Sequence, residues 1–320
     1  MLFSKNDHLT SVSFPGVPES ALGFSMSSGK LTIWLSAIRP KTLGLSISPV
    51  LVGTCLAWWQ TGEIHGLPAM AALLVAMLIQ IGTNLHNDAA DALSGTDTDE
   101  RLGPLRVTAQ GLLTAKKVQR ASLMAFVWAF ILGIYLAWVG GWPIILLGLL
   151  SLSAGASYSG GPWPISASPL GELFVFVFFG LIATSGSYFL QTGQFTGVSM
   201  VAGSMLGCFA AAVLAVNNYR DRVTDRKSGR RTLAVLITPA ASRAEYGILL
   251  ILPFLILLLM YPVFGLPGLS LLPLLLLPVA AYLFVKITRL AVDSSLNLLL
   301  AHTARLQLVF SLLFCLGLSV

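Results

Sequence analysis

The chain has 320 residues, of which 56% are hydrophobic and only 10% are charged. Soluble domains carry about a quarter charged residues, so this composition excludes a soluble enzyme, a disulfide-rich scaffold and a disordered chain. The net charge of +6 requires no nucleic-acid partner, because the basic residues follow a membrane pattern that is described below.

Residues 1–30 are rich in Ser, Gly and Pro. They contain no basic segment followed by an apolar one, which a cleaved signal peptide would have. We expect them to form a disordered cytoplasmic tail. The remaining residues, 31–320, are expected to form one transmembrane domain.

Long runs without a charged residue dominate that domain. A helix needs about 20 mostly apolar residues to cross a bilayer. Two runs have room for one span each, three longer runs are split into two spans each by Gly- or Pro-containing segments, and a last run, interrupted only by Arg305, holds one span. The runs are 42–62, 64–87, 121–171, 173–219, 246–285 and 294–320. The sequence therefore predicts an all-α polytopic membrane protein with nine transmembrane helices.

The basic residues orient these spans. Lys and Arg are concentrated in the N-terminal tail and in three connecting segments, 94–120, 220–243 and 286–293. The connections on the other side, near 61–67, 139–143, 191–198 and 262–268, contain no Lys or Arg. Because basic loops stay in the cytoplasm, we expect the N-terminus inside and the C-terminus outside.

The first of two acidic clusters ends the span predicted over 64–87. It reads Asn84-Leu-His-Asn-Asp88-Ala-Ala-Asp91 and is followed by three more acids between 97 and 100. Asn84, Asp88 and Asp91 are spaced i, i+4, i+7, which places them on one helix face. A carboxylate this close to the membrane is costly and indicates function.

The second cluster ends the span predicted to precede residue 220. Asn217, Asp221 and Asp225 are spaced i, i+4, i+8 and again share one helix face. The Asn-x-x-x-Asp pattern thus occurs twice, 133 residues apart. The repetition indicates two similar halves that face each other across one cavity.

Carboxylate and amide oxygens at these positions suit Mg²⁺, which is commonly bound by one or two carboxylates plus substrate phosphates. Four carboxylates and a diphosphate carry more negative charge than two Mg²⁺ ions neutralise. Basic side chains beside the clusters are therefore expected to complete the balance. The candidates are Arg39, Lys41, Arg106, Arg222, Arg226 and Lys227. Lys116, Lys117 and Arg120 are explained by membrane topology alone.

At this point the sequence resembles a known family. Residues 84–91, together with 94–97 and 101–106, resemble the first aspartate-rich motif of the UbiA superfamily of intramembrane aromatic prenyltransferases. They are most similar to the MenA branch, the 1,4-dihydroxy-2-naphthoate prenyltransferases of menaquinone and phylloquinone synthesis. Segments 37–42, 156–159, 171–172 and 217–233 agree with that branch.

The resemblance implies a UbiA-like fold of nine helices around a central cavity. It also implies that the two motifs hold Mg²⁺ and the prenyl diphosphate. The corresponding residues are Asn84, Asp88, Asp91, Asn217, Asp221 and Asp225. Tyr158 and Glu172 fall in matching segments and are candidate substrate-binding residues, although a carboxylate at Glu172 also suits the start of a helix.

The implied reaction is Mg²⁺-dependent transfer of a polyprenyl or phytyl group from its diphosphate to an aromatic acceptor. Loss of diphosphate leaves an allylic cation, which an electron-rich ring attacks; with dihydroxynaphthoate, the ring loses CO₂ as it recovers aromaticity. A helix bundle excludes water from the cation, and its cavity should open sideways to lipid for the isoprenoid tail. We expect the site on the cytoplasmic face of the inner membrane.

Two alternatives remain at this stage. A UbiA-type enzyme with another acceptor, such as 4-hydroxybenzoate or homogentisate, would have the same motifs. A secondary transporter would share the paired halves and the intramembrane acids. However, the acids lie at span ends on one face, which leaves little for an ion path across the bilayer.

Overall fold

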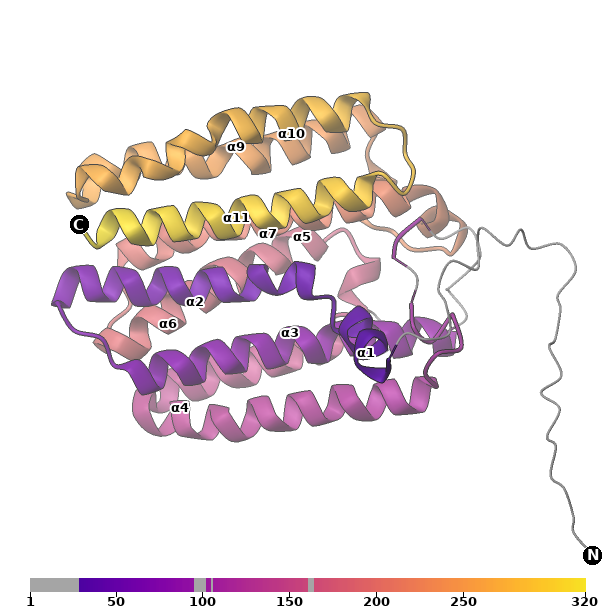
Figure 1. The fold of residues 1–320 in the computed structure, drawn as a ribbon, viewed down its shortest axis with the longest axis horizontal. Helices are drawn as coiled ribbons and strands as arrows, with labels where there is room; N and C mark the ends of the chain where they lie inside the picture. Colours follow the sequence, from indigo (N-terminus) through magenta and orange to yellow (C-terminus); the bar gives the residue numbers. More distant parts are fainter. Residues whose placement is uncertain (1–28, 95–101, 105, 161–163) are drawn as a thin grey trace, which may run out of the picture.

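The computed structural model describes residues 29–94, 102–104, 106–160 and 164–320. In these ranges every regular element is helical, and the long helices lie side by side in one bundle (Figure 1). Eight of the described helices are long and apolar enough to cross a membrane. The predicted all-α membrane class is confirmed. The expected tail falls almost wholly on residues 1–28, which lie outside the described residues.

The first turn of the chain is set by a proline. Helix α1 (Lys30–Ile38) ends at Arg39, and α2 (Pro40–Thr61) begins directly after it. Pro40 favours a helix start and disfavours a right-handed helical conformation in the residue before it. Arg39 accordingly adopts a left-handed conformation with φ 59°.

A hairpin follows the first spans. Helix α3 covers Gly66–Ser94 and α4 covers Ala115–Ser157, but Gly141 interrupts α4 with φ 66° and ψ −157°, a conformation that glycine tolerates. A Cβ added to Gly155 would lie 3.1 Å from the Phe126 ring, although a straight helix would separate these residues by about 44 Å. Thus α4 is two antiparallel arms, and the break predicted within 138–143 is confirmed. Nine crossings and the N-in orientation stay predictions.

Helix α7 (Gly197–Lys227) lies at the centre of the bundle, and 78% of the residues in its apolar 18-residue stretch are buried. Before it, α5 (Gly171–Val175), the π-helical η3 (Phe176–Ile182) and α6 (Ala183–Thr192) form one span. A Cβ on Gly180 of η3 would lie 2.5 Å from backbone atoms of Gly203 and Gly207 in α7. The Gly-x-x-x-Gly spacing therefore lets the two backbones approach closely.

The C-terminal helices pack on the other side of α7. They are α8 (Leu233–Leu236), α9 (Pro239–Phe264), η4 (Gly268–Leu276), α10 (Leu277–Arg289) and α11 (Leu296–Leu318). Phe209 of α7 meets Phe254 of α9 and Phe310 of α11, with ring centroids 5.1–5.9 Å apart in edge-to-face arrangements. This side of the bundle is packed with buried apolar side chains of α7, α9, α10 and α11.

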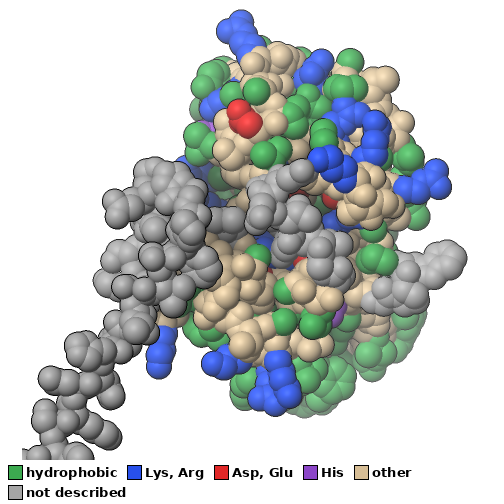
Figure 2. All heavy atoms as spheres, turned by 90° about the vertical axis from the view of Figure 1, so that its right-hand side faces the viewer, with side chains coloured by type: hydrophobic (Ala, Val, Ile, Leu, Met, Phe, Trp, Pro, Cys, Tyr) green, Lys and Arg blue, Asp and Glu red, His purple; other side chains and the backbone are tan. Residues whose placement is uncertain are grey.

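Helices α3 and α7 end on the same side of the bundle, which we call the motif end. It is the right-hand side of Figure 1. Seen from that side, Lys and Arg side chains are spread around the edge of the surface (Figure 2). The arrangement agrees with the concentration of basic residues in the segments that connect helices here.

Candidate active site

A cavity of about 610 Å³ lies between α2, α3, both arms of α4, η3, α6 and α7. Most of its lining is apolar. Its polar lining at the motif end comes from Arg39, Thr42, Asn84, Asn87, Tyr158 and Asn217. Four predicted site residues therefore meet at one cavity: Arg39, Asn84, Tyr158 and Asn217.

The wall formed by α4 reaches the outer surface of the bundle. Phe130 and Ile134 of the first arm and Ile145 and Leu149 of the second line the cavity. All four side chains are also roughly half exposed. On this side only single side chains separate the cavity from the surroundings of the bundle.

Two residues of the first motif hold neighbouring backbone in place. The side-chain nitrogen of Asn84 donates a hydrogen bond to the backbone carbonyl of Ile38 at 2.9 Å. The carboxylate of Asp88, only 2% exposed, accepts the backbone N–H groups of Val107 and Thr108 at 3.3 Å each and also the Thr108 hydroxyl. The oxygens of Asp88 thus fix the segment that follows the motif.

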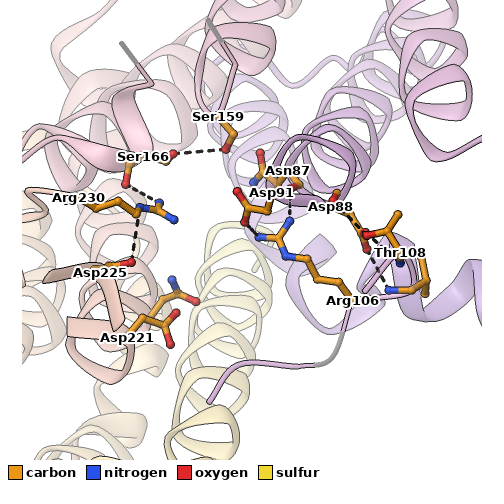
Figure 3. Close-up of polar contacts among 12 residues, drawn as sticks. Asn87, Asp88, Asp91, Arg106, Thr108, Ser159, Ser166, Asp221, Asp225 and Arg230 are labelled. Atoms are coloured by element: carbon orange, nitrogen blue, oxygen red, sulfur yellow. Dashed lines mark hydrogen bonds and ion pairs between the residues drawn. The ribbon is translucent and has the colours of Figure 1, made fainter. Parts of the chain in front are cut away.

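A second pair of α3 residues, Asn87 and Asp91, lies toward the second motif, and Asn87 lines the cavity as Asn84 does. Arg106, a buried residue of the following loop, forms an ion pair with Asp91 and donates to the carbonyl of Asn87 (Figure 3). Among the described residues, the side-chain oxygen of Asn87 is buried without a hydrogen-bond partner. Asn87 and Asp91 are spaced i, i+4, as Asn217 and Asp221 are.

An arginine inside α7 organises the second motif. The guanidinium of Arg220, 2% exposed, holds both carboxylate oxygens of Asp221, from Nε at 2.8 Å and from Nη2 at 2.5 Å. The same Nη2 donates to the side-chain oxygen of Asn217 at 2.9 Å. Nη1 donates to the side-chain oxygen of Asn297 in α11 at 2.6 Å.

The last turns of α7 are tied to the loop after α4. Arg230 lies 3.5 Å from the Asp225 carboxylate and donates to the carbonyl of Ser166 in the short 3₁₀ helix η2 (Ile165–Ala167) at 2.9 Å (Figure 3). Nearby, Asn218 donates to the carboxylate of Glu172 at 2.7 Å. Glu172 is buried beside α7 and is not part of the cavity lining. Its contact fixes the face of α7 next to Asn217.

The two motifs lie close enough to interact. Asp91 on α3 and Asp221 on α7 both act electrostatically on Asp225. Within the described ranges, no three His, Cys, Asp or Glu residues are grouped tightly enough to hold a metal by themselves. Asp91, Asp221 and Asp225 each form an ion pair with an arginine, so a cation here would share these carboxylates with Arg106, Arg220 and Arg230.

The other predicted basic residues lie away from the cavity lining. Lys41 is exposed in the first turn of α2, and Lys227 is exposed in the last turn of α7. Arg222 donates to the carbonyl of Ile237 at 3.1 Å, and Arg226 donates to that of Val235 at 2.9 Å. These two guanidinium groups hold the segment around α8 against α7.

An aromatic row flanks the polar end of the cavity. Tyr158 packs 5.7 Å from Phe174, and Phe174 packs 4.4 Å from Phe178, measured between ring centroids. Burial, followed by the nearby Glu172 carboxylate, raises the pKa of Tyr158 above its ordinary value. The phenol is therefore a hydrogen-bond donor at neutral pH.

Sequence reasoning missed Asn87, Arg220, Arg230 and Asn297. Asn87 could have been found, because its spacing to Asp91 repeats that of Asn217 to Asp221. Arg220 lies within the second motif, but sequence alone does not show that it binds its own neighbour. Asn297 stands 77 residues from Arg220, and no local pattern links them.

The family model of the UbiA prenyltransferase family matches residues 46–308. The chain belongs to the UbiA prenyltransferase family. Among curated relatives, the 1,4-dihydroxy-2-naphthoate octaprenyltransferase of Escherichia coli is 35% identical over 89% of this chain and 94% of that protein. The enzyme of the same name from Haemophilus influenzae is 31% identical over 92% of this chain and 98% of that protein. The branch indicated by the motifs is confirmed, and the chain is a prenyltransferase.

The solved structures agree on the fold. A UbiA homologue from Archaeoglobus fulgidus bound to DMAPP and Mg²⁺ aligns with a TM-score of 0.66 at 15% sequence identity, over 90% of this chain and 99% of that one. The structure of a UbiA homologue from the same organism bound to GPP and Mg²⁺ has a TM-score of 0.63. The helical arrangement around the cavity is therefore that of the UbiA fold.

Proposed function

We propose that this protein transfers a polyprenyl or phytyl group from its diphosphate to 1,4-dihydroxy-2-naphthoate, with loss of the carboxyl group as CO₂. The observation that carries the proposal is one cavity, apolar along its length, whose polar end receives both aspartate motifs through Asn87 and Asn217. Relatives named for this reaction cover most of the chain. The apolar part suits an isoprenoid, and the polar end suits a diphosphate.

The residues at the polar end fit Mg²⁺. Asn87 offers a buried oxygen without a partner among the described residues. Asp91, Asn217 and Asp221 add hard oxygen donors. We infer that these four residues, with Asp225, hold the cation together with the diphosphate, while Asn84 and Asp88 anchor the neighbouring backbone. When bound, Mg²⁺ would neutralise diphosphate charge and stabilise it as a leaving group.

The protein's own groups contribute the rest of the chemistry. Arg106 and Arg220 bring guanidinium groups to the carboxylates, where they can stabilise negative charge on the departing diphosphate. Phe174 and Phe178 line the cavity, and aromatic rings can stabilise a nearby cation such as the allylic fragment. Tyr158 can donate a hydrogen bond to an oxygen of either substrate.

We further infer that the motif end faces the cytoplasm, with the protein in the cytoplasmic membrane. The support is the distribution of Lys and Arg, which gather in the segments on this side. A reporter fused after Val320 tests it. Activity of a reporter that folds only outside the cytoplasm supports the orientation, and activity of a reporter that works only inside contradicts it.

Purified protein in lipid nanodiscs tests the reaction. It is given dihydroxynaphthoate labelled in its carboxyl carbon, with Mg²⁺ and octaprenyl, geranylgeranyl or phytyl diphosphate in turn. We expect a prenylated naphthol product and one labelled CO₂ per product. If 4-hydroxybenzoate or homogentisate is prenylated and dihydroxynaphthoate is not, the acceptor is wrong although the enzyme class stands.

A further inference from the structure

Asn297, near the start of α11, is half-buried between two polypeptide segments that are far from it in sequence. Its side-chain oxygen accepts from Arg220 Nη1 at 2.6 Å. Its side-chain nitrogen donates to the carbonyl of Leu102 at 2.9 Å. The amide can serve both partners because it has an acceptor for the guanidinium, which only donates, and a donor for the carbonyl, which only accepts.

One of these partners organises the second motif. Arg220 uses Nε and Nη2 for Asp221 and Asn217, which leaves Nη1 for Asn297. The arginine is buried, so a guanidinium nitrogen without an acceptor there would be costly. Asn297 therefore helps to fix the orientation in which the guanidinium holds Asp221.

The other partner belongs to the loop that completes the first motif. Leu102 lies four residues before Arg106, the residue that forms an ion pair with Asp91. Anchoring Leu102 shortens the free length of this loop and so lowers the entropy lost when Arg106 takes its place. A single amide thus contacts the arginine of one motif and the loop that carries the arginine of the other.

We propose that Asn297 is a positioning residue that couples the two aspartate motifs. It is not part of the cavity lining and acts only through Arg220 and Leu102. The proposal rests on the proposed function for its link to catalysis: Asn297 acts on the part of the site that binds the diphosphate and does not affect binding of the aromatic acceptor.

Kinetics of two variants test the link to catalysis. Asn297→Leu removes both bonds, and Asn297→Asp keeps the acceptor for Arg220 but loses the donor to Leu102. The matched control is Leu298→Ala, the next residue of α11, whose side chain is 52% exposed. For Asn297→Leu we expect at least a tenfold rise in KM for prenyl diphosphate and in the half-activating Mg²⁺ concentration. The KM for the aromatic acceptor should stay within twofold.

A merely structural role would give a different pattern. Loss of active, folded enzyme would lower kcat and the Tm and leave both KM values unchanged. That result, or an equal rise in the two KM values, would overturn the proposal.

Limited proteolysis in detergent tests the loop contact without any catalytic activity. Trypsin cleaves the bond between Arg101 and Leu102, and cleavage requires Leu102 to leave Asn297. We expect cleavage here to be about tenfold faster in Asn297→Leu and in Asn297→Asp, and unchanged in Leu298→Ala. Wild-type rates in both Asn297 variants would contradict the coupling. Faster cleavage in a protein that prenylates no aromatic acceptor would reject the proposed function and support the contact.

Discussion

The two aspartate motifs have the same Asn-x-x-x-Asp spacing, but they are held in different ways. On α7 the basic partner is Arg220, which lies in the same helix as the Asp221 that it binds and is buried by the bundle. On α3 the basic partner is Arg106, which belongs to the loop after the helix. The second motif is therefore organised by helix packing, whereas the first is complete only when its loop is in place.

This difference separates residues that bind from residues that support binding. In the first motif, Asp88 and Asn84 hold the 107–108 backbone and Ile38, while Asn87 and Asp91 face the second motif. In the second motif, Asn217 and Asp221 share one arginine. The carboxylates of the two motifs should accordingly respond differently to substitution.

The largest effect is expected at the facing carboxylates. Asp91→Asn and Asp221→Asn should each lower kcat/KM for prenyl diphosphate by about a thousandfold, or about 4 kcal/mol, because each removes a charged ligand. Steady-state prenyl transfer at saturating Mg²⁺ measures it. Glu63→Gln, at an exposed position on the opposite end of the bundle, should match wild type. Near-normal turnover in either Asp variant would contradict the two-motif site.

Asp88 should show a mixed effect. Asp88→Ala leaves the backbone N–H groups of Val107 and Thr108 without their acceptor, so we expect activity to fall about a hundredfold and the Tm to fall with it. Asp91→Ala should lower activity more and the Tm less. Thermal unfolding in detergent and prenyl transfer are measured on the same samples. The reverse order of the two Tm values would show that Asp88 is the ligand and Asp91 the support.

Arg106 and Lys116 separate a specific contact from general loop charge. Arg106 is buried against Asp91, whereas Lys116 is exposed in the first turn of α4. Arg106→Ala should lower kcat/KM for prenyl diphosphate by at least tenfold, or about 1.4 kcal/mol, and Lys116→Ala should not. Equal losses in the two variants would mean that only the total positive charge of the loop matters.

The smallest effect is expected at the first-motif asparagines. Asn87→Leu removes a neutral oxygen from the cation site, so the half-activating Mg²⁺ concentration should rise about fivefold. Asn84→Leu should leave that concentration unchanged and lower the Tm, because the carbonyl of Ile38 loses its donor. A Mg²⁺ titration of both variants shows whether Asn87 or Asn84 contributes to cation binding. If the half-activating Mg²⁺ concentration rises only in Asn84→Leu, Asn84 is the ligand, as the sequence predicts.

The fold followed from the sequence to the extent that it depends on local composition. Charge-free runs located the spans, and the Gly140-Gly141-Trp-Pro segment located the hairpin in α4. The sequence does not choose between the pairs Asn84–Asp88 and Asn87–Asp91, because both have the same spacing. Which pair lies toward the second motif depends on how α3 packs against α2, α4 and α6, and helical periodicity alone does not contain that information.

The basic residues that neutralise the motif carboxylates were also predicted only in part. Loop cations were expected to offset the carboxylates, and Arg106 does so. The main counter-charge of the second motif is Arg220, a neighbour in sequence that ordinary helix-face reasoning places away from Asp221. A long side chain can fold back along its own helix when other elements bury it. Here Asn297 supplies the remaining acceptor.

The α4 hairpin bears on the length of the isoprenoid that the enzyme can accept. A closed pocket limits the length of the isoprenoid that it binds, because a chain longer than the pocket is deep does not fit. Here Phe130, Ile134, Ile145 and Leu149 form a wall one side chain thick that also faces outward. On the proposed function, a tail that parts these side chains would continue into the hydrocarbon of the membrane, and the depth of the cavity would not limit its length. The length of the side chain on the product would then follow from the prenyl diphosphates that are supplied to the enzyme.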